Sequence, residues 1–95
     1  MPQDFQKAIM QRMEQPGWVT TRGILRDPTG QAEAEDYLAV EETMKELAGE
    51  GLIVLWRLIV LEDGVEMLAA ARPGLELDKD LEQRGAWAKA ERYEP

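Results

Sequence analysis

The chain has 95 residues, a hydrophobic fraction of 44% and a formal net charge of −8, with no cysteine and no histidine. This length suits one domain with one compact core, and the missing residue types exclude disulfides, thiolate nucleophiles, Cys/His zinc sites and imidazole catalysis. The negative charge opposes the long-range attraction by which proteins find nucleic acid.

A first helix is predicted to begin after Asp4, whose carboxylate is a good N-cap. The apolar residues that follow recur at helical spacing and share one face: Phe5, Ala8, Ile9 and Met13. Gln-Pro-Gly at residues 15–17 ends the helix, because proline cannot donate to the helical ladder. Trp18 and Val19 then form a short extended segment, which we expect to pair with a later ribbon.

A short second helix is predicted over residues 22–26, capped by Thr20 or Thr21. It is followed by Asp-Pro-Thr-Gly at residues 27–30, where nearly every residue favours a turn.

The longest helix is predicted over residues 31–49. Its apolar stripe comprises Tyr37, Val40, Met44 and Leu47, a spacing typical of an amphipathic helix. Gly49 and Gly51 supply the residue with positive φ that commonly ends a helix.

Residues 52–61 are rich in large and β-branched apolar side chains and predict a strand. Asp63-Gly64 predicts a type I′ turn into a returning strand that ends before residue 73. The strand at residues 52–61 is apolar on both faces, whereas a two-stranded ribbon with one solvent-exposed face needs only one apolar face. We therefore expect its second face to be covered, either by the C-terminal helix or by another subunit.

That last helix is predicted from Asp78, as its cap, to about Tyr93, with only a weak apolar pattern. The chain is thus expected to comprise a domain over residues 1–74 and a helical extension over residues 75–95. The extension belongs to the same domain or forms a dimer contact.

Residues 40–53 read Val-Glu-Glu-Thr-Met-Lys-Glu-Leu-Ala-Gly-Glu-Gly-Leu-Ile. The spacing of the valine, the leucine and the final Gly-Leu-Ile resembles the end of the recognition helix in bacterial regulators of the MarR and PadR type. Together with the preceding elements, the resemblance to the winged helix-turn-helix superfamily covers about residues 4–72. It implies a small α+β domain with a two- or three-stranded antiparallel wing, followed here by an additional C-terminal helix.

In those regulators the exposed positions beside the valine are usually Ser, Thr or Arg, which contact phosphates and base edges. Here these positions hold Ala39, Glu41 and Glu42, and the expected tip of the wing holds Glu62 and Asp63. The resemblance therefore implies a DNA-binding fold whose expected binding surface would repel phosphate.

The first functional hypothesis is a non-catalytic module that binds protein, either a partner with a basic surface or a second copy of the chain in a homodimer. Acidic residues of the long helix and two tryptophans are the candidate contacts: Glu35, Asp36, Glu41, Glu42, Glu46, Trp56 and Trp87. The structural alternatives are a solvated helix face for the acids and core packing for the tryptophans.

The second hypothesis is a DNA-binding transcriptional regulator, which the charge disfavours. Phosphate contacts would come from the second helix and the wing: Thr21, Arg22, Arg26, Arg57 and Arg72. The structural alternative for these arginines is pairing with nearby acids, which contributes at most about 1 kcal/mol for an exposed pair.

We expect no enzymatic activity, cofactor or metal, because the sequence carries no nucleophile elbow, phosphate-cradling glycine loop or metal triad. The apolar run at residues 52–61 is interrupted by Arg57 and is much shorter than the roughly 20 residues of a membrane span. The first residues lack the basic and apolar regions of a signal peptide. A cytoplasmic location, away from membranes, is therefore expected.

Overall fold

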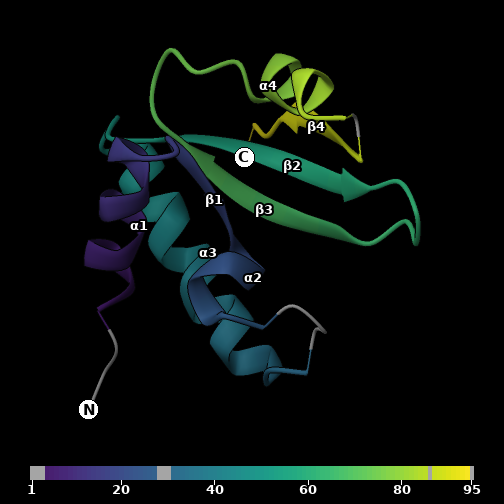
Figure 1. Cartoon of the computed structure of the whole chain (residues 1–95). Coiled ribbons are helices and arrows are strands. Elements are labelled where there is room, and N and C mark those ends of the chain that lie inside the picture. Colours follow the sequence, from purple (N-terminus) through teal and green to yellow (C-terminus); the bar gives the residue numbers. More distant parts are fainter. Residues whose placement is uncertain (1–3, 28–30, 86, 95) are drawn as a thin grey trace.

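The computed structural model describes residues 4–27, 31–85 and 87–94. They form a compact α+β domain in which helices flank a four-stranded antiparallel sheet with the strand order β1-β3-β2-β4. Figure 1 shows α1, α2 and α3 on one side of the sheet and α4 on the other. The elements in chain order are α1 (Phe5–Glu14), β1 (Trp18–Thr20), α2 (Thr21–Leu25), α3 (Ala34–Gly49), β2 (Val54–Val60), β3 (Glu66–Ala71), α4 (Leu77–Gln83) and β4 (Ala88–Arg92).

The first half of the chain forms the predicted elements with small shifts at their ends. The Asp4 carboxylate accepts a hydrogen bond from the backbone N–H of Lys7 at 3.0 Å, which confirms it as the N-cap of α1. The Thr20 hydroxyl accepts from the N–H of Gly23, also at 3.0 Å, so α2 begins one residue earlier than predicted. The short strand β1 is confirmed, and it pairs with β3.

Helix α3 starts at Ala34, three residues later than predicted, and ends at the predicted glycine signal. Gly51 has φ +78°. Its N–H donates to the carbonyl of Ala48 at 3.0 Å, and the N–H of Leu52 donates to the carbonyl of Leu47 at 3.1 Å. This pair of bonds is a Schellman motif, which satisfies carbonyls that the helix end would leave without donors.

The hairpin between β2 and β3 lies where it was predicted, but the type I′ turn was wrong. The strands close at Val60, whose N–H donates to the carbonyl of Val65 at 2.9 Å, so the loop has four residues, 61–64. Gly64 has φ +73°, whereas Asp63 does not have the positive φ that a type I′ turn requires. The Asp63 carboxylate instead accepts from the N–H of Val65 at 3.0 Å, which stabilises the longer loop.

The prediction of a single last helix to Tyr93 was also wrong. Helix α4 ends at Gln83, and the chain then returns as strand β4, which pairs antiparallel with β2. The ladder extends beyond the strand at both ends, because Leu61 N–H donates to the Trp87 carbonyl and Tyr93 N–H donates to the Leu55 carbonyl. The described sheet therefore has four strands rather than the two or three predicted.

Each face of the sheet has its own hydrophobic core. The core beneath α1 and α3 comprises Ile9, Met13, Val19, Val40, Met44, Leu47, Ile53, Leu55, Leu68 and Ala70. The core beneath α4 comprises Trp56, Leu58, Ala69, Ala71, Leu77, Leu81 and Ala88. The expectation that something covers the second face of β2 is confirmed, and α4 of the same chain covers it.

Candidate functional site

The outward side of α3 carries most of the acidic residues singled out in the sequence. Val40, Met44 and Leu47 are buried against the sheet. Because successive residues turn by about 100° around a helix, the side opposite them is formed by Glu35, Leu38, Glu42, Lys45 and Glu46. We call these five residues the outer face of α3. All five are exposed, and 58% of the Leu38 surface is accessible.

Two further predicted acids lie on the flanks of α3. Asp36 is exposed, whereas Glu41 is half-buried. Glu41 lines a groove of about 240 Å³ between α2, α3 and β3, together with Arg22, Tyr37 and Glu66. Arg22 and Glu41 therefore share one groove, in which an arginine and two glutamates face the same space.

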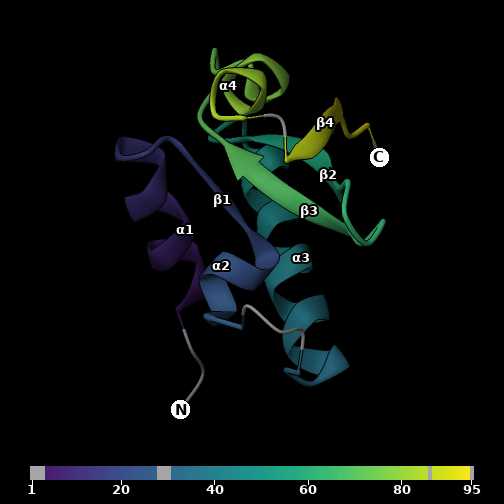
Figure 2. The same cartoon turned by 45° about the vertical axis from the view of Figure 1, so that its right-hand side comes forward.

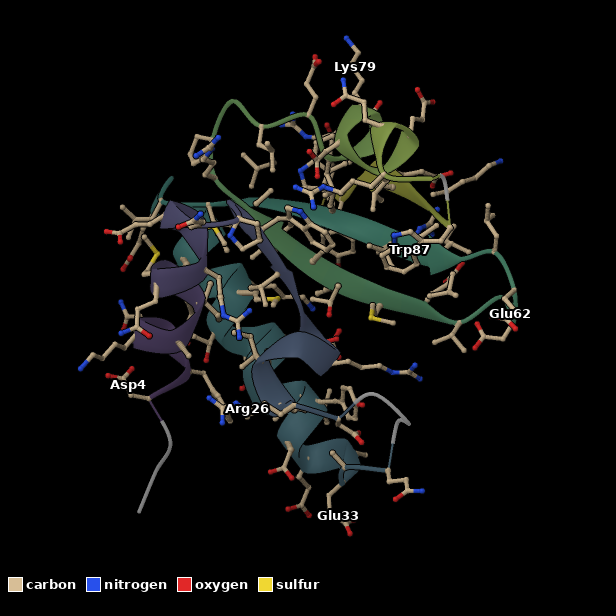
Figure 3. All side chains as sticks on the ribbon, viewed as in Figure 1. Asp4, Arg26, Glu33, Glu62, Lys79 and Trp87 are labelled. Carbon is tan, nitrogen blue, oxygen red and sulfur yellow. The ribbon has the colours of Figure 1, made fainter. Side chains whose placement is uncertain are left out.

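The hairpin adds more negative charge next to this groove. Glu62, Asp63 and Glu66 are all exposed, and Figure 3 shows Glu62 at the tip of the hairpin. A DNA-binding wing needs cations at this position to contact phosphates. The hairpin tip offers carboxylates instead.

The three residues at the second helix that were proposed to contact DNA differ in their exposure to solvent. Thr21 is 2% exposed, so its side chain belongs to the interior. Arg22 is half-buried between the groove described above and a second one formed with Arg26 and Asp27. Arg26 is exposed at the end of α2, in the left-handed conformation with φ 55°.

The two arginines proposed from the wing lie apart from α2. Arg57 pairs with Glu91 on the neighbouring strand β4, and hydrogen bonding to that carboxylate raises the pKa of Arg57. Arg72 follows β3, and its backbone N–H donates to the carbonyl of Gly17, just before β1. Helix α2 follows the other end of β1. The predicted DNA contacts are thus dispersed and do not form one cationic surface.

Asp27 joins the end of α2 to the beginning of α3. Its carboxylate accepts hydrogen bonds from the backbone N–H groups of Gln31 and Ala32, at 2.9 and 2.7 Å, and from the Tyr37 hydroxyl at 2.7 Å. The bond from Tyr37 is the largest of the causes that lower the pKa of Asp27. Burial, followed by the same bond to Asp27, raises the pKa of Tyr37. This network fixes the orientation of α3 against α2.

The two candidate tryptophans have opposite environments. Trp56 is 4% exposed and belongs to the core beneath α4, where the Arg92 guanidinium lies 5.4 Å from its ring centre. Trp87 precedes β4 and is 46% exposed. Figure 3 shows Trp87 near the hairpin end of the sheet. The backbone carbonyl of Trp87 accepts a hydrogen bond from the N–H of Leu61, which is also exposed. Only Trp87 is therefore available to a partner.

The chain was compared with protein-family models, with curated proteins and with solved structures. No match was found. The α+β architecture and the surface chemistry described above are thus the basis for any functional proposal.

Two further observations on the described residues concern metal binding and membrane spanning. Within residues 4–27, 31–85 and 87–94, no three metal-ligating side chains gather closely enough to hold a metal ion. In the same part of the chain, none of the helices has both the length and the apolar character needed to cross a bilayer.

Two features of the surface were missed in the sequence. Leu38 was not singled out, although its position relative to Val40 and Leu47 on a helical wheel would have placed it among the outward acids. Strand β4 was predicted as helix, so its outer edge was not considered. The alternation of alanine with charged residues at positions 88–91 was the available signal.

Proposed function

We propose that this chain is a winged-helix module that binds protein through the outer face of α3 and carries out no catalysis. The winged-helix assignment is supported by the element order α1-β1-α2-α3-β2-β3 and by the pairing of β1 with β3 beside the hairpin. It is further supported by the glycine stop that leads from α3 into the hairpin. Because fold does not determine function, the partner class is argued from the surface.

The observation that carries the proposal is the composition of the outer face of α3. Leu38 is 58% exposed, with Glu35 one turn before it, Glu42 one turn after it and Glu46 a further turn along the same face. An apolar side chain within a charged surround is typical of protein contacts, where an apolar centre lies inside a polar rim. The acids would attract a basic partner at long range, and Leu38 would be buried on contact.

The charge also determines which partners suit this face. Two copies meeting through the outer face of α3 would place its three glutamates and one lysine against the same set of the second copy around a twofold axis. Such a contact is repulsive, so the proposed partner of this face is a different protein with a basic surface. Attraction between exposed charges weakens as salt screens them, and the affinity should therefore decrease with ionic strength.

A DNA-binding regulator is the second candidate, favoured by the two grooves that Arg22 lines, one beside α3 and one that it shares with Arg26. The burial of Thr21 and the pairing of Arg57 with Glu91 count against it. So does the acidic hairpin tip, since neutralisation of phosphates supplies most non-specific affinity for DNA.

Affinity capture from an extract of the source cells, with captured proteins identified by mass spectrometry, tests the protein-binding proposal. The baits are the wild type, Leu38→Ala and Glu35→Lys/Glu42→Lys. The matched control is Glu14→Lys/Glu82→Lys, which makes the same charge change at exposed positions of α1 and α4. We expect a basic protein that the wild type and the control retain and that both α3 variants lose.

Gel retardation of duplex DNA at low salt separates the two candidates. We expect no retardation by the wild type. Retardation that disappears in Arg22→Ala/Arg26→Ala would instead support the DNA-binding regulator. Equal capture of every protein by all four baits would contradict the role of the outer face of α3.

A further inference from the structure

Strand β4 forms one edge of the sheet, as Figure 2 shows. The bonds from Leu61 N–H to Trp87 and from Tyr93 N–H to Leu55 show that odd-numbered residues of this segment direct their backbone groups to β2. In an antiparallel strand, the backbone N–H and C=O groups of alternate residues point to opposite edges of the strand. Ala88, Ala90 and Arg92 therefore direct their N–H and C=O groups to the outer edge.

We propose that this edge pairs with β4 of a second copy of the chain, antiparallel and around a twofold axis at Ala90. The backbone directions allow a twofold axis at an outward residue (88, 90 or 92) or at an inward one (89 or 91), but an axis at Lys89 or Glu91 would place that residue against the same charge of the second copy. A centre at Ala90 uses the whole strand: Ala90 bonds to Ala90 of the second copy, and Ala88 bonds to Arg92 of the second copy. Each of these pairs exchanges two backbone hydrogen bonds.

The charged side chains favour this register. With Ala90 at the centre, Lys89 lies opposite Glu91 of the second copy, and Glu91 lies opposite Lys89 of the second copy. Both are exposed. They occupy non-hydrogen-bonded positions of the new ladder, where opposing side chains are closest, at about 4.5 Å between Cα atoms. The Oε2 atom of Glu91 accepts from Arg57, and a carboxylate has a second oxygen with which to accept from lysine.

The aromatic residues at the two ends follow the same symmetry. Trp87 and Tyr93 continue the ladder by one residue on either side of β4, through the two bonds described above. In the proposed register Trp87 therefore lies opposite Tyr93 of the second copy, at both ends of the interface. The pairing would cover the exposed indole of Trp87 with an aromatic partner, and such cross-strand pairs are stabilising.

The competing registers are less favourable. A centre at Arg92 brings Arg92 against Arg92 of the second copy, and like charges directly opposite each other are destabilising. A centre at Ala88 leaves Glu91 and Arg92 beyond the paired segment. Charged edge strands usually prevent association. Here self-pairing is attractive, because Lys89 lies opposite the oppositely charged Glu91 of the second copy.

Sedimentation velocity over a wide range of protein concentration tests the proposal. We expect the wild type to form a dimer and Ala90→Pro to remain a monomer, because proline removes the central N–H donor. That N–H does not bond to β2, so the far-ultraviolet circular dichroism of the variant should match the wild type. A wild type that is monomeric at the highest concentration would overturn the proposal.

Charge variants test the register without a proline. Lys89→Glu and Glu91→Lys each place like charges at both central pairs, and each should weaken the dimer by about tenfold or more. A mixture of the two variants should restore dimers, since each glutamate then faces a lysine. Lys89→Arg is the matched control and should dimerise normally. Dimers that persist equally in both charge variants would contradict this register, whereas the α3 proposal is tested separately and does not depend on it.

Discussion

The two faces of the sheet are covered in very different ways. On one side, α1 and α3, with 10 and 16 residues, place large side chains such as Ile9, Met44 and Leu47 against the strands. On the other side, α4 has seven residues and buries two leucines, Leu77 and Leu81. The sheet on that side contributes alanines at three buried positions beside Trp56 and Leu58.

We therefore expect the stability of the domain to be unevenly distributed between the two sides of the sheet. Regions with few buried apolar contacts open locally at a lower free energy than the rest of the molecule. Helix α4 and strand β4 depend on few large side chains, whereas α3 is held by the larger core and by the Asp27 network. We therefore expect α4 and β4 to open before α1 and α3.

Truncation in the larger core should have the greatest effect. Met44 is fully buried beneath α3, and Met44→Ala should lower the free energy of unfolding by about 3 kcal/mol, through lost burial and the cavity left behind. Urea denaturation measures the change. Leu38→Ala is the control on the same helix, and its exposed side chain should cost less than about 0.5 kcal/mol. Equal losses in the two variants would contradict the assignment of the inner and outer sides of α3.

Truncation beneath α4 should have a smaller and more local effect. Leu81 is fully buried, and Leu81→Ala should cost about 2 kcal/mol. In native-state hydrogen exchange, the amides of α4 and β4 should exchange faster while those of α3 keep their protection. Lys79→Ala, at an exposed position of the same helix, should leave exchange nearly unchanged. Faster exchange throughout α3 in Leu81→Ala would show that the two sides open together.

The smallest expected effect concerns the network that holds the start of α3. Tyr37→Phe removes the hydroxyl that donates to Asp27, so the lowered pKa of Asp27 should rise toward its ordinary value of 3.8. A lowered carboxylate pKa stabilises the fold above the ordinary value and loses that effect as the pH falls through the lowered one. The wild type should therefore be more stable than Tyr37→Phe at neutral pH, and the difference should shrink in acid.

Urea denaturation of both proteins across this pH range measures that dependence. Tyr93→Phe, a matched removal of a hydroxyl far from Asp27 in the sequence, should show no such pH-dependent difference from the wild type. A difference for Tyr37→Phe that stayed constant into acid would mean that the hydroxyl acts by packing and not through the Asp27 carboxylate.

The elements that the sequence predicted well depend on signals inside the segment itself. Asp4 caps α1 through the N–H of Lys7, only three residues away. Gly51 ends α3 because its own backbone adopts a positive φ. The acidic outer face of α3 was likewise predictable, because it depends only on helical spacing.

Features that depend on residues far away in the sequence could not be predicted locally and follow from the tertiary structure. Residues 88–92 become a strand because β2, about thirty residues earlier, offers an edge with unpaired backbone groups. No local pattern strong enough to form a helix opposes that pairing. Thr21 is interior because packing encloses it, and Arg57 is neutralised by Glu91 only once β4 lies beside β2. Local backbone preferences were thus set by the sequence alone, whereas long-range hydrogen bonding and burial determined which side chains remain on the surface to bind a partner.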